Sequence, residues 1–213
     1  MKKTLFLSAL LVFFYSAAFS QDPELEYYKS KEIRTLLGRN RAGGGYGAFG
    51  AGYSVIDNNH AVLFGGRFGW IASHSVGIGI GAMGFINEFH YEPSIDRDVF
   101  LAGGYGGLYI EPILLPRSPV HLSFPLMLGA GGISYVSKES DLNNNLIEDS
   151  EAFLMIEPGA EIELNLTKFF RLAIGVTYRF PTAFDVGISG TPRASAESLR
   201  GLSYMVTMKF GKF

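Results

Sequence analysis

The sequence predicts an all-β protein, an eight-stranded antiparallel up-and-down transmembrane β-barrel preceded by a short N-terminal amphipathic helix or lead. Three observations support this prediction. Aliphatic residues alternate with small or polar ones along most of the chain, the alternating segments number eight, and short connections alternate with long ones. Alternation with period two is typical of strands, because successive side chains point to opposite faces.

The composition narrows the class of protein further. The chain has 27 glycines among 213 residues, about twice the usual share, and 18% of its residues are charged, against about 25% in soluble domains. With no cysteine, it has no disulfide framework, no lipoprotein anchor and no thiolate zinc site. The net charge of −2 offers no basic face for nucleic acid, so we expect no nucleic-acid partner.

Residues 1–20 have the features of a signal peptide. Lys2 and Lys3 precede the apolar stretch 5–19, and the small residue Ser20 ends the segment. An uncleaved membrane anchor is the alternative, but about fifteen apolar residues fall short of the ~20 that span a bilayer. We expect cleavage near Ser20 and export of the mature chain.

Residues 21–43 form a lead that differs from the rest of the chain. Asp22 is typical of a helix N-cap and Pro23 of the first helical position, and Gly38 is typical of a helix end. Apolar residues are spaced among charged ones between them. The segment is either an amphipathic helix that docks on a membrane or partner, or a loosely ordered periplasmic lead.

Residues 44–213 then carry the barrel pattern. The clearest segment runs from Phe169 to Phe180, while Pro125 and Pro158 indicate bulges or strand ends. Most segments have ten or more residues, as strands that cross a bilayer at a tilt require. The eight segments are roughly 45–55, 60–71, 75–86, 99–112, 120–136, 152–165, 168–180 and 201–213.

The connections predict the orientation of the barrel. The segments 87–98, 137–151 and 181–200 are long and polar, whereas the other connections are short. Outer-membrane barrels place short turns in the periplasm and long loops outside. We therefore expect both termini in the periplasm and the three long loops at the cell surface.

A soluble lipocalin-type barrel is the structural alternative, but its exterior should be polar. Here the face opposite the aliphatic one is rich in glycine and alanine, which suits the crowded lumen of eight strands. We therefore expect the aliphatic face to be on the outside of the barrel. Aromatic residues near strand ends are expected to form interfacial girdles: Trp70, Phe85, Tyr109, Tyr135, Phe169, Phe180 and Phe210.

Eight charged residues are expected in the lumen by the same alternation. We expect Glu163 to oppose Arg171, and Glu157 or Glu161 to approach Arg179. Charges in so narrow a lumen need partners or trapped water, so the prediction is a structural salt-bridge network rather than a conducting path. The residues are Arg67, Glu111, Glu157, Glu161, Glu163, Arg171, Arg179 and Lys209.

Three segments carry a family resemblance: Gly65–Ile71, Ile156–Glu161 and Met208–Phe213. They resemble small eight-stranded outer-membrane β-barrels, the class of the OmpA transmembrane domain and OmpX, and more closely an uncharacterised outer-membrane group of Gram-negative bacteria. The resemblance implies outer-membrane lipid and the barrel-assembly machinery as partners, with Phe210 and Phe213 as the assembly signal. These two aromatics have opposite parity, which departs from strict alternation. No catalytic residues come with the resemblance.

An enzyme is the first functional alternative. His121 and Ser123 resemble the pair of an outer-membrane lipid A deacylase family, but the topology places them inward near the periplasmic end. His74 is expected in a tight turn and His90 in an outer loop. We therefore predict no catalytic residues.

A calcium loop is the second candidate site. Asp141, Asn143 and Asn145 alternate as calcium ligands do, but Leu146 replaces the required glycine and Ala152 the bidentate acid. We expect a solvated acidic loop over 141–151, and no metal or cofactor.

The expected function is therefore that of an outer-membrane barrel with a closed, charge-paired lumen. Its role is structural or lies in surface interactions through the outer loops, with a surface ligand that the sequence does not identify. The alternatives are a lipid-modifying enzyme, a small-solute pore and a soluble periplasmic ligand-binding barrel.

Overall fold

The computed structural model describes residues 43–92, 97–137, 147–182, 185–188 and 191–213. All of them belong to one compact unit, Leu37–Phe213. The predicted signal peptide, the N-terminal lead and most of the 141–151 acidic loop lie outside the described residues.

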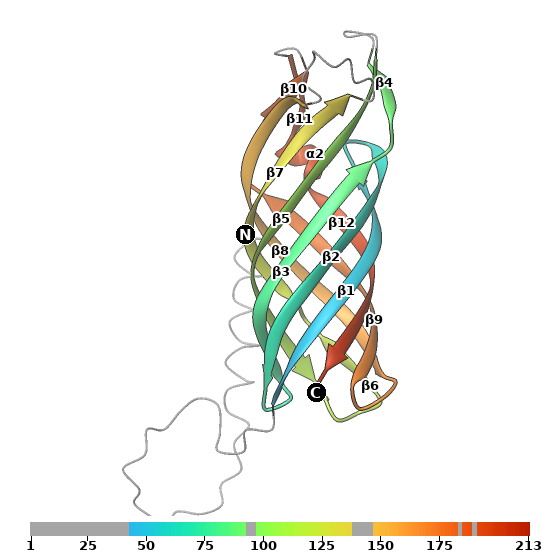
Figure 1. The fold of residues 1–213 in the computed structure, drawn as a ribbon, viewed down its shortest axis with the longest axis vertical. Coiled ribbons are helices and arrows are strands. Elements are labelled where there is room, and N and C mark those ends of the chain that lie inside the picture. The colour runs from blue at the N-terminus through green and yellow to red at the C-terminus, as the bar shows by residue number, and fades with distance from the viewer. Residues whose placement is uncertain (1–42, 93–96, 138–146, 183–184, 189–190) are drawn as a thin grey trace, which may run out of the picture. The chain divides into compact units, whose positions relative to one another are not determined.

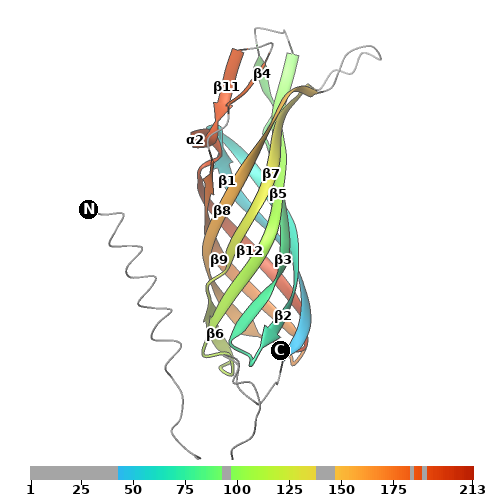
Figure 2. The ribbon, with the colours of Figure 1, turned by 90° about the vertical axis from the view of Figure 1, so that its left-hand side faces the viewer.

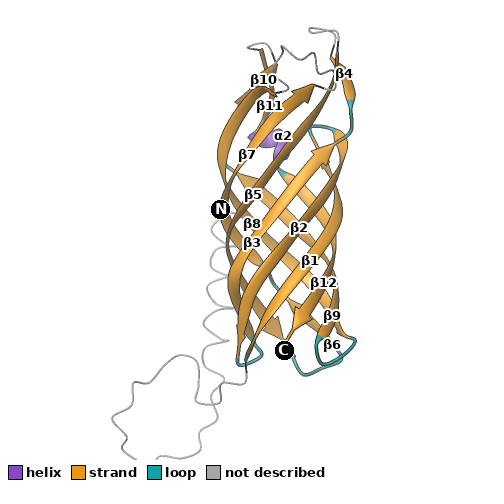
Figure 3. Ribbon diagram, in the orientation of Figure 1, coloured by secondary structure: helices purple, strands orange, loops and turns teal. Residues whose placement is uncertain are grey.

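Among the described residues, strands make up most of this unit and one short helix interrupts them (Figure 3). No helix within the described residues is long and apolar enough to cross a membrane. The elements are β1 (Gly44–Ile56), β2 (Asn59–Ala72), β3 (Val76–Asn87), β4 (His90–Glu92), β5 (Arg97–Leu114), β6 (Val120–Ser123), β7 (Leu126–Ser137), β8 (Ile147–Asn165), β9 (Phe170–Pro181), β10 (Asp185–Ile188), β11 (Thr191–Ser195), α2 (Ala196–Leu199) and β12 (Gly201–Gly211).

Antiparallel pairing closes the sheet into a barrel (Figure 1). The pair β1 and β12 closes the ring, with a register that runs from Tyr46 opposite Gly211 to Ser54 opposite Ser203. Strand β4 continues β3 along β5, and β6 and β7 share one position between β5 and β8. The ring therefore has eight strand positions, which confirms the predicted fold.

Local sequence explains the tight turns and one break. Asp57 and Asn58 both have positive φ, as the two-residue turn of a β-hairpin requires, so β1 and β2 pair directly around it. Pro125 separates β6 from β7 within the predicted segment 120–136, which confirms the break expected at this residue, because proline cannot donate to the ladder. The Pro125 carbonyl still accepts a hydrogen bond from Gly159 N at 2.7 Å.

The barrel has two distinct ends. We call the end with the short turns and the C-terminus the inner end, and the opposite one the outer end (Figure 2). The long strands β5 and β8, of 18 and 19 residues, reach the outer end together with β4. The segment 181–200, expected as a loop, contains the separate β10–β11 hairpin and α2.

The aliphatic face points outward, as Phe68 at 67% exposed and Leu108 at 65% exposed illustrate. Trp70, Phe169, Phe180 and Phe210 are exposed on this face too. The expectation that aromatic residues near strand ends form girdles on the outer face is wrong for three residues. They are buried in the lumen, because the alternation along a strand decides the face on which a side chain lies: Phe85, Tyr109 and Tyr135. Other exposed residues of the face are Phe49, Val62, Phe64, Ile78, Ile80, Leu128, Leu154, Ile156, Ile162, Ile174 and Val206.

Candidate functional site

The lumen divides into an apolar outer half and a charged inner half. Alternate side chains of every ring strand point into it, and those near the outer end pack as one core. The main members of that core are Ile56, Leu63, Phe85, Leu101, Tyr105, Ile133, Tyr135, Phe153, Met155 and Leu199. The charged half lies towards the C-terminal ends of β5, β8 and β12, and it is the candidate site.

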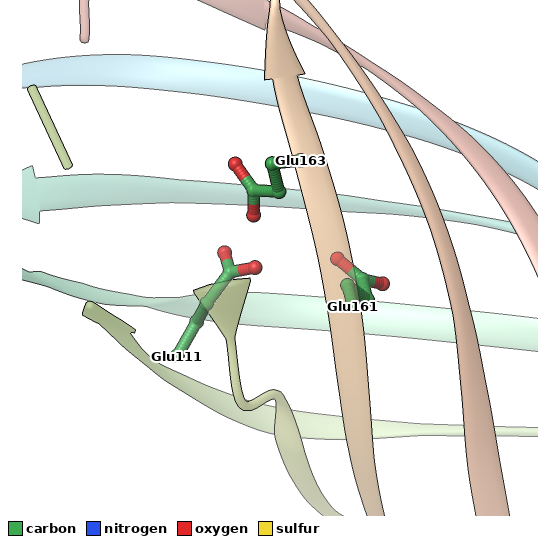
Figure 4. A group of neighbouring side chains, drawn as sticks. All are labelled: Glu111, Glu161 and Glu163. Carbon is green, nitrogen blue, oxygen red and sulfur yellow. The ribbon is translucent and has the colours of Figure 1, made fainter. Parts of the chain in front are cut away.

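Lys209 is the centre of the charged half. Its Nζ lies 2.9 Å from Glu161 Oε2 and also contacts Glu111 Oε1 and Glu163 Oε1. Oxygen atoms of these three carboxylates lie within 4.8 Å of one another (Figure 4), a spacing that a metal ion could use. Because the ammonium contacts all three, the cluster already holds a cation, and the donor set does not fit a metal site.

Arg67 supplies the second cation of the cluster. Its Nη2 donates to both oxygens of Glu161, at 2.7 and 2.8 Å. Its Nη1 donates to the hydroxyl of Tyr109, and the guanidinium carbon lies 4.7 Å from the centre of the same ring. Arg67 on β2 and Lys209 on β12 therefore both bind Glu161 on β8, so the cluster joins strands across the barrel.

Arg171 supplies the third cation, through Glu163. Its Nη1 lies 3.5 Å from Glu163 Oε2, which also lies 3.0 Å from His121 Nε2. The expectation that Glu163 opposes Arg171 in register is wrong, because Glu163 pairs with Ala173 and Arg171 with Asn165. The two side chains meet diagonally along the same face of the sheet.

The cluster is balanced in formal charge. Glu111, Glu161 and Glu163 face Lys209, Arg67 and Arg171, and Tyr46 donates a further hydrogen bond to Glu111 Oε2 at 2.9 Å. Removing charges from water is costly unless each has a partner with good geometry. The mutual pairing of six charges explains how this half of the lumen can be both polar and buried.

Phe213 lies at the inner end of the charged half. Its ring is 3.9 Å from the guanidinium carbon of Arg171 and 6.2 Å from the ring of Tyr46. It also packs against the small apolar group formed by Tyr46, Ala48, Ile71 and Ile113. Phe210 instead is exposed and stacks on Phe170, with ring centres 4.8 Å apart.

Arg179 lies in the outer half, apart from the cluster. Its Nε donates to the carbonyl of Leu199 at 2.8 Å and its Nη2 to Ser54 Oγ at 2.7 Å, while Nη1 donates to Ser203 Oγ. The expectation that Glu157 or Glu161 approaches Arg179 is met by Glu157, which interacts with Arg179 electrostatically. Glu161 instead binds Arg67 and Lys209. Arg179 therefore joins β9 to both closing strands and to α2.

Glu157 is placed between the two halves. It is buried, and its Oε1 accepts a hydrogen bond from Thr177 Oγ1 at 2.6 Å. It lines a cavity of about 50 Å³ with Arg67 and Glu161. A volume of this size holds one or two water molecules, each of which occupies about 30 Å³ in the liquid.

His121 and Ser123 both lie beside the carboxylates of the charged half. His121 faces Glu163, whereas Ser123 Oγ donates to Glu161 Oε2 at 3.3 Å. Both are buried in the charged half near the inner end. His74 lies in the β2–β3 turn with positive φ, and His90 lies on β4, its ring 6.3 Å from that of Tyr135.

Tyr46, Tyr109 and helix α2 are not among the parts of the lumen expected from the sequence. Tyr46 and Tyr109 take part in the charged cluster, and their inward parity is the signal that could have placed them there. Helix α2 has no such signal, because four residues are too short to show a periodic pattern.

Solved structures with a similar fold include outer-membrane β-barrel proteins. The crystal structure of Neisserial surface protein A (NspA) matches with a TM-score of 0.53 and 14% identity, over 80% of this chain and 96% of that one. The N-terminal β-barrel domain of Pseudomonas aeruginosa OprF matches with a TM-score of 0.46 and 13% identity, over 80% of this chain and 98% of that one. Ail of Yersinia pestis, in complex with the heparin analogue sucrose octasulfate, matches with a TM-score of 0.46 and 13% identity. The match covers 79% of this chain and 98% of that one.

No protein-family model matches the sequence, and a comparison with curated proteins finds no relative. At these identities the structural likeness shows a shared fold and nothing about function.

Proposed function

We propose that the protein is an outer-membrane β-barrel of a Gram-negative bacterium with a closed lumen, and that it has a structural or surface-interaction role at its outer end. The proposal assigns no catalytic step and no cofactor. Its immediate surroundings are outer-membrane lipid.

The exposed aliphatic face supports the membrane location. His60 and Trp70 are both exposed and lie ten residues apart on β2, which is about 33 Å of strand at about 3.3 Å per residue. A strand tilt of about 40° reduces this to about 25 Å of height. The apolar band of membrane barrels has about the same height. Soluble monomers rarely expose an apolar surface of this extent.

The closed lumen rests chiefly on the charged cluster. Arg67, Lys209 and Arg171 bind carboxylates from β5 and β8, so their side chains cross the space that a conducting path would need. Phe213 packs at the inner end, and buried Leu199 packs in the outer core. Eight strands leave an interior just wide enough for side chains to fill.

The outer end is where a surface-interaction role would reside. Strands β5 and β8 are the longest of the ring, and β4 and the β10–β11 hairpin lie at this end. Segments carried by a rigid scaffold are common binding sites. The location of the barrel would present them to the cell exterior.

Planar-bilayer recording tests the proposal. We expect the refolded protein to give no conductance steps, because the ion pairs fill the lumen. We expect Glu157→Ala and Arg171→Ala to give none either, while both variants unfold at lower temperature than the original chain. Regular steps with the unmodified protein would contradict the closed lumen and favour a small-solute pore.

A further inference from the structure

A groove of about 540 Å³ lies at the outer end of the seam between β1 and β12. We call it the seam groove. The ladder that closes the barrel has its outermost pair at Ser54 and Ser203, whereas β1 continues to Ile56 and β12 starts at Gly201. The groove occupies the place where the two strands are no longer paired.

Bonds from inside the barrel form the back of the seam groove. Ser54 Oγ donates to the carbonyl of Leu202 at 2.6 Å, and Asp57 N donates to the carbonyl of Ser198 at 2.9 Å. Behind them, Arg179 Nη2 donates to Ser54 Oγ at 2.7 Å. These contacts hold the groove in a defined shape without filling it.

The two walls of the seam groove differ in chemistry. The wall formed by the strands is apolar and aromatic, with Val55, Leu202, Tyr53 and Tyr204 all exposed. Tyr53 and Tyr204 are direct cross-strand partners, and the Tyr53 hydroxyl is hydrogen-bonded to His60 Nδ1 at 2.5 Å. Such a wall suits a hydrocarbon chain.

The opposite wall is charged, with both signs present. Asp57 lines it from the β1–β2 turn, and Glu197 and Arg200 line it from α2 and its end. Arg200 Nη1 lies 2.5 Å from Glu197 Oε1, and both side chains are exposed. An ion pair in water contributes little stability, so a ligand that offers one group of each sign can replace it at low cost.

The groove also lies at the border of the apolar band. Tyr53 is opposite Val62 in the register of β1 and β2, two residues from the exposed His60 that marks the outer limit of the band. Tyrosine is common at this depth, because its ring is apolar and its hydroxyl polar. The apolar wall thus faces lipid chains and the charged wall the headgroup region.

We propose that the seam groove binds one membrane lipid with a zwitterionic headgroup, whose phosphate meets Arg200 and whose ammonium meets Glu197 and Asp57. One chain of the lipid lies along Val55 and Leu202, beside the two tyrosines. The two carboxylates and one guanidinium make the charged wall net negative, which disfavours a purely anionic headgroup. The inference rests on the proposed membrane location.

Native mass spectrometry of the full barrel in octyl glucoside, a detergent with an uncharged headgroup, tests the proposal. With phosphatidylethanolamine as the probe, we expect a one-to-one adduct that is at least about tenfold weaker with phosphatidylglycerol. Arg200→Gln should weaken phosphatidylethanolamine binding by about tenfold, because a phosphate contact is charge-assisted. Glu197→Gln should bring the affinities for the two lipids closer together.

Arg117→Gln is the matched control, because Arg117 is equally an exposed arginine but lies in the β5–β6 connection at the inner end. It should bind as the original chain does. Equal binding of both lipids, an equal loss in the control, or equally tight binding of free phosphoethanolamine would overturn the inference. A barrel found in the outer membrane that forms no adduct would overturn the inference alone, whereas a protein absent from that membrane would overturn the proposed function.

Discussion

At the scale of single residues, Lys209 explains why three carboxylates can share the inner half of the lumen. Its ammonium contacts Glu111, Glu161 and Glu163, which would otherwise repel one another in a buried space. Arg67 and Arg171 each neutralise one of the same carboxylates from a different strand. The cluster is therefore a set of mutually dependent pairs rather than three separate salt bridges.

Replacing Lys209 with methionine should strongly destabilise the barrel. The substitution keeps much of the apolar stem but leaves buried carboxylates without their shared cation, which costs about 3–5 kcal/mol. Urea unfolding of the refolded protein in lipid vesicles measures the free energy of unfolding. Lys212→Met is the control, because Lys212 follows β12 and is exposed. Equal stability of the two variants would show that the cluster contributes nothing.

Alternation in the sequence tells which face a charged residue occupies, but not which partner it binds. Glu163 and Arg171 illustrate the limit, because their contact is diagonal and depends on a register that the turn at 165–170 sets. Arg179 shows a second limit. Its acceptors include the Leu199 carbonyl, which only the fold of a distant segment brings near.

At the scale of elements, β12 separates two aromatic residues that the sequence groups together. Phe210 is on the outer face and stacks on Phe170 of β9, whereas Phe213 follows the strand and covers Arg171 inside the inner end. The structure thus gives one residue access to the lipid side and the other a place in the lumen. We therefore expect a partner that recognises the strand from the membrane to bind Phe210 rather than Phe213.

Phe210→Ala should therefore lower the amount of folded barrel in the outer membrane, while Phe213→Ala should not. The expected reduction is several-fold, measured as the folded fraction in isolated membranes. Phe169→Ala is the matched control, because Phe169 is an exposed aromatic at the same end outside the last strand. If Phe213→Ala lowers assembly as much as Phe210→Ala, the assignment of Phe210 as the assembly residue is wrong.

The strands could be predicted from sequence to within a few residues, because alternation over ten or more positions is a strong pattern. The elements near the outer end could not. Strand β4, the β10–β11 hairpin and α2 have three to five residues each, too few for a periodic signal. Pro125 does carry a signal, and it marks the break between β6 and β7.

At the scale of the whole molecule, the barrel is inverted relative to a soluble protein. Its aliphatic side chains are outside and its charges inside, as the exposed Phe68 and Leu108 and the buried Glu163 and Lys209 illustrate. An aliphatic exterior of this extent is stable only where the surroundings are apolar, and the buried charges need partners. The same inversion could be predicted from the glycine and alanine content of the inner face.

Heat modifiability in the outer-membrane fraction tests this account most directly. Cells are fractionated, and the outer membrane is run on a detergent gel with and without boiling. The account predicts that the protein is in this fraction and that the unboiled sample migrates differently from the boiled one, because the closed ring of β1 to β12 resists detergent until it is heated. A soluble periplasmic protein with no mobility change would contradict it.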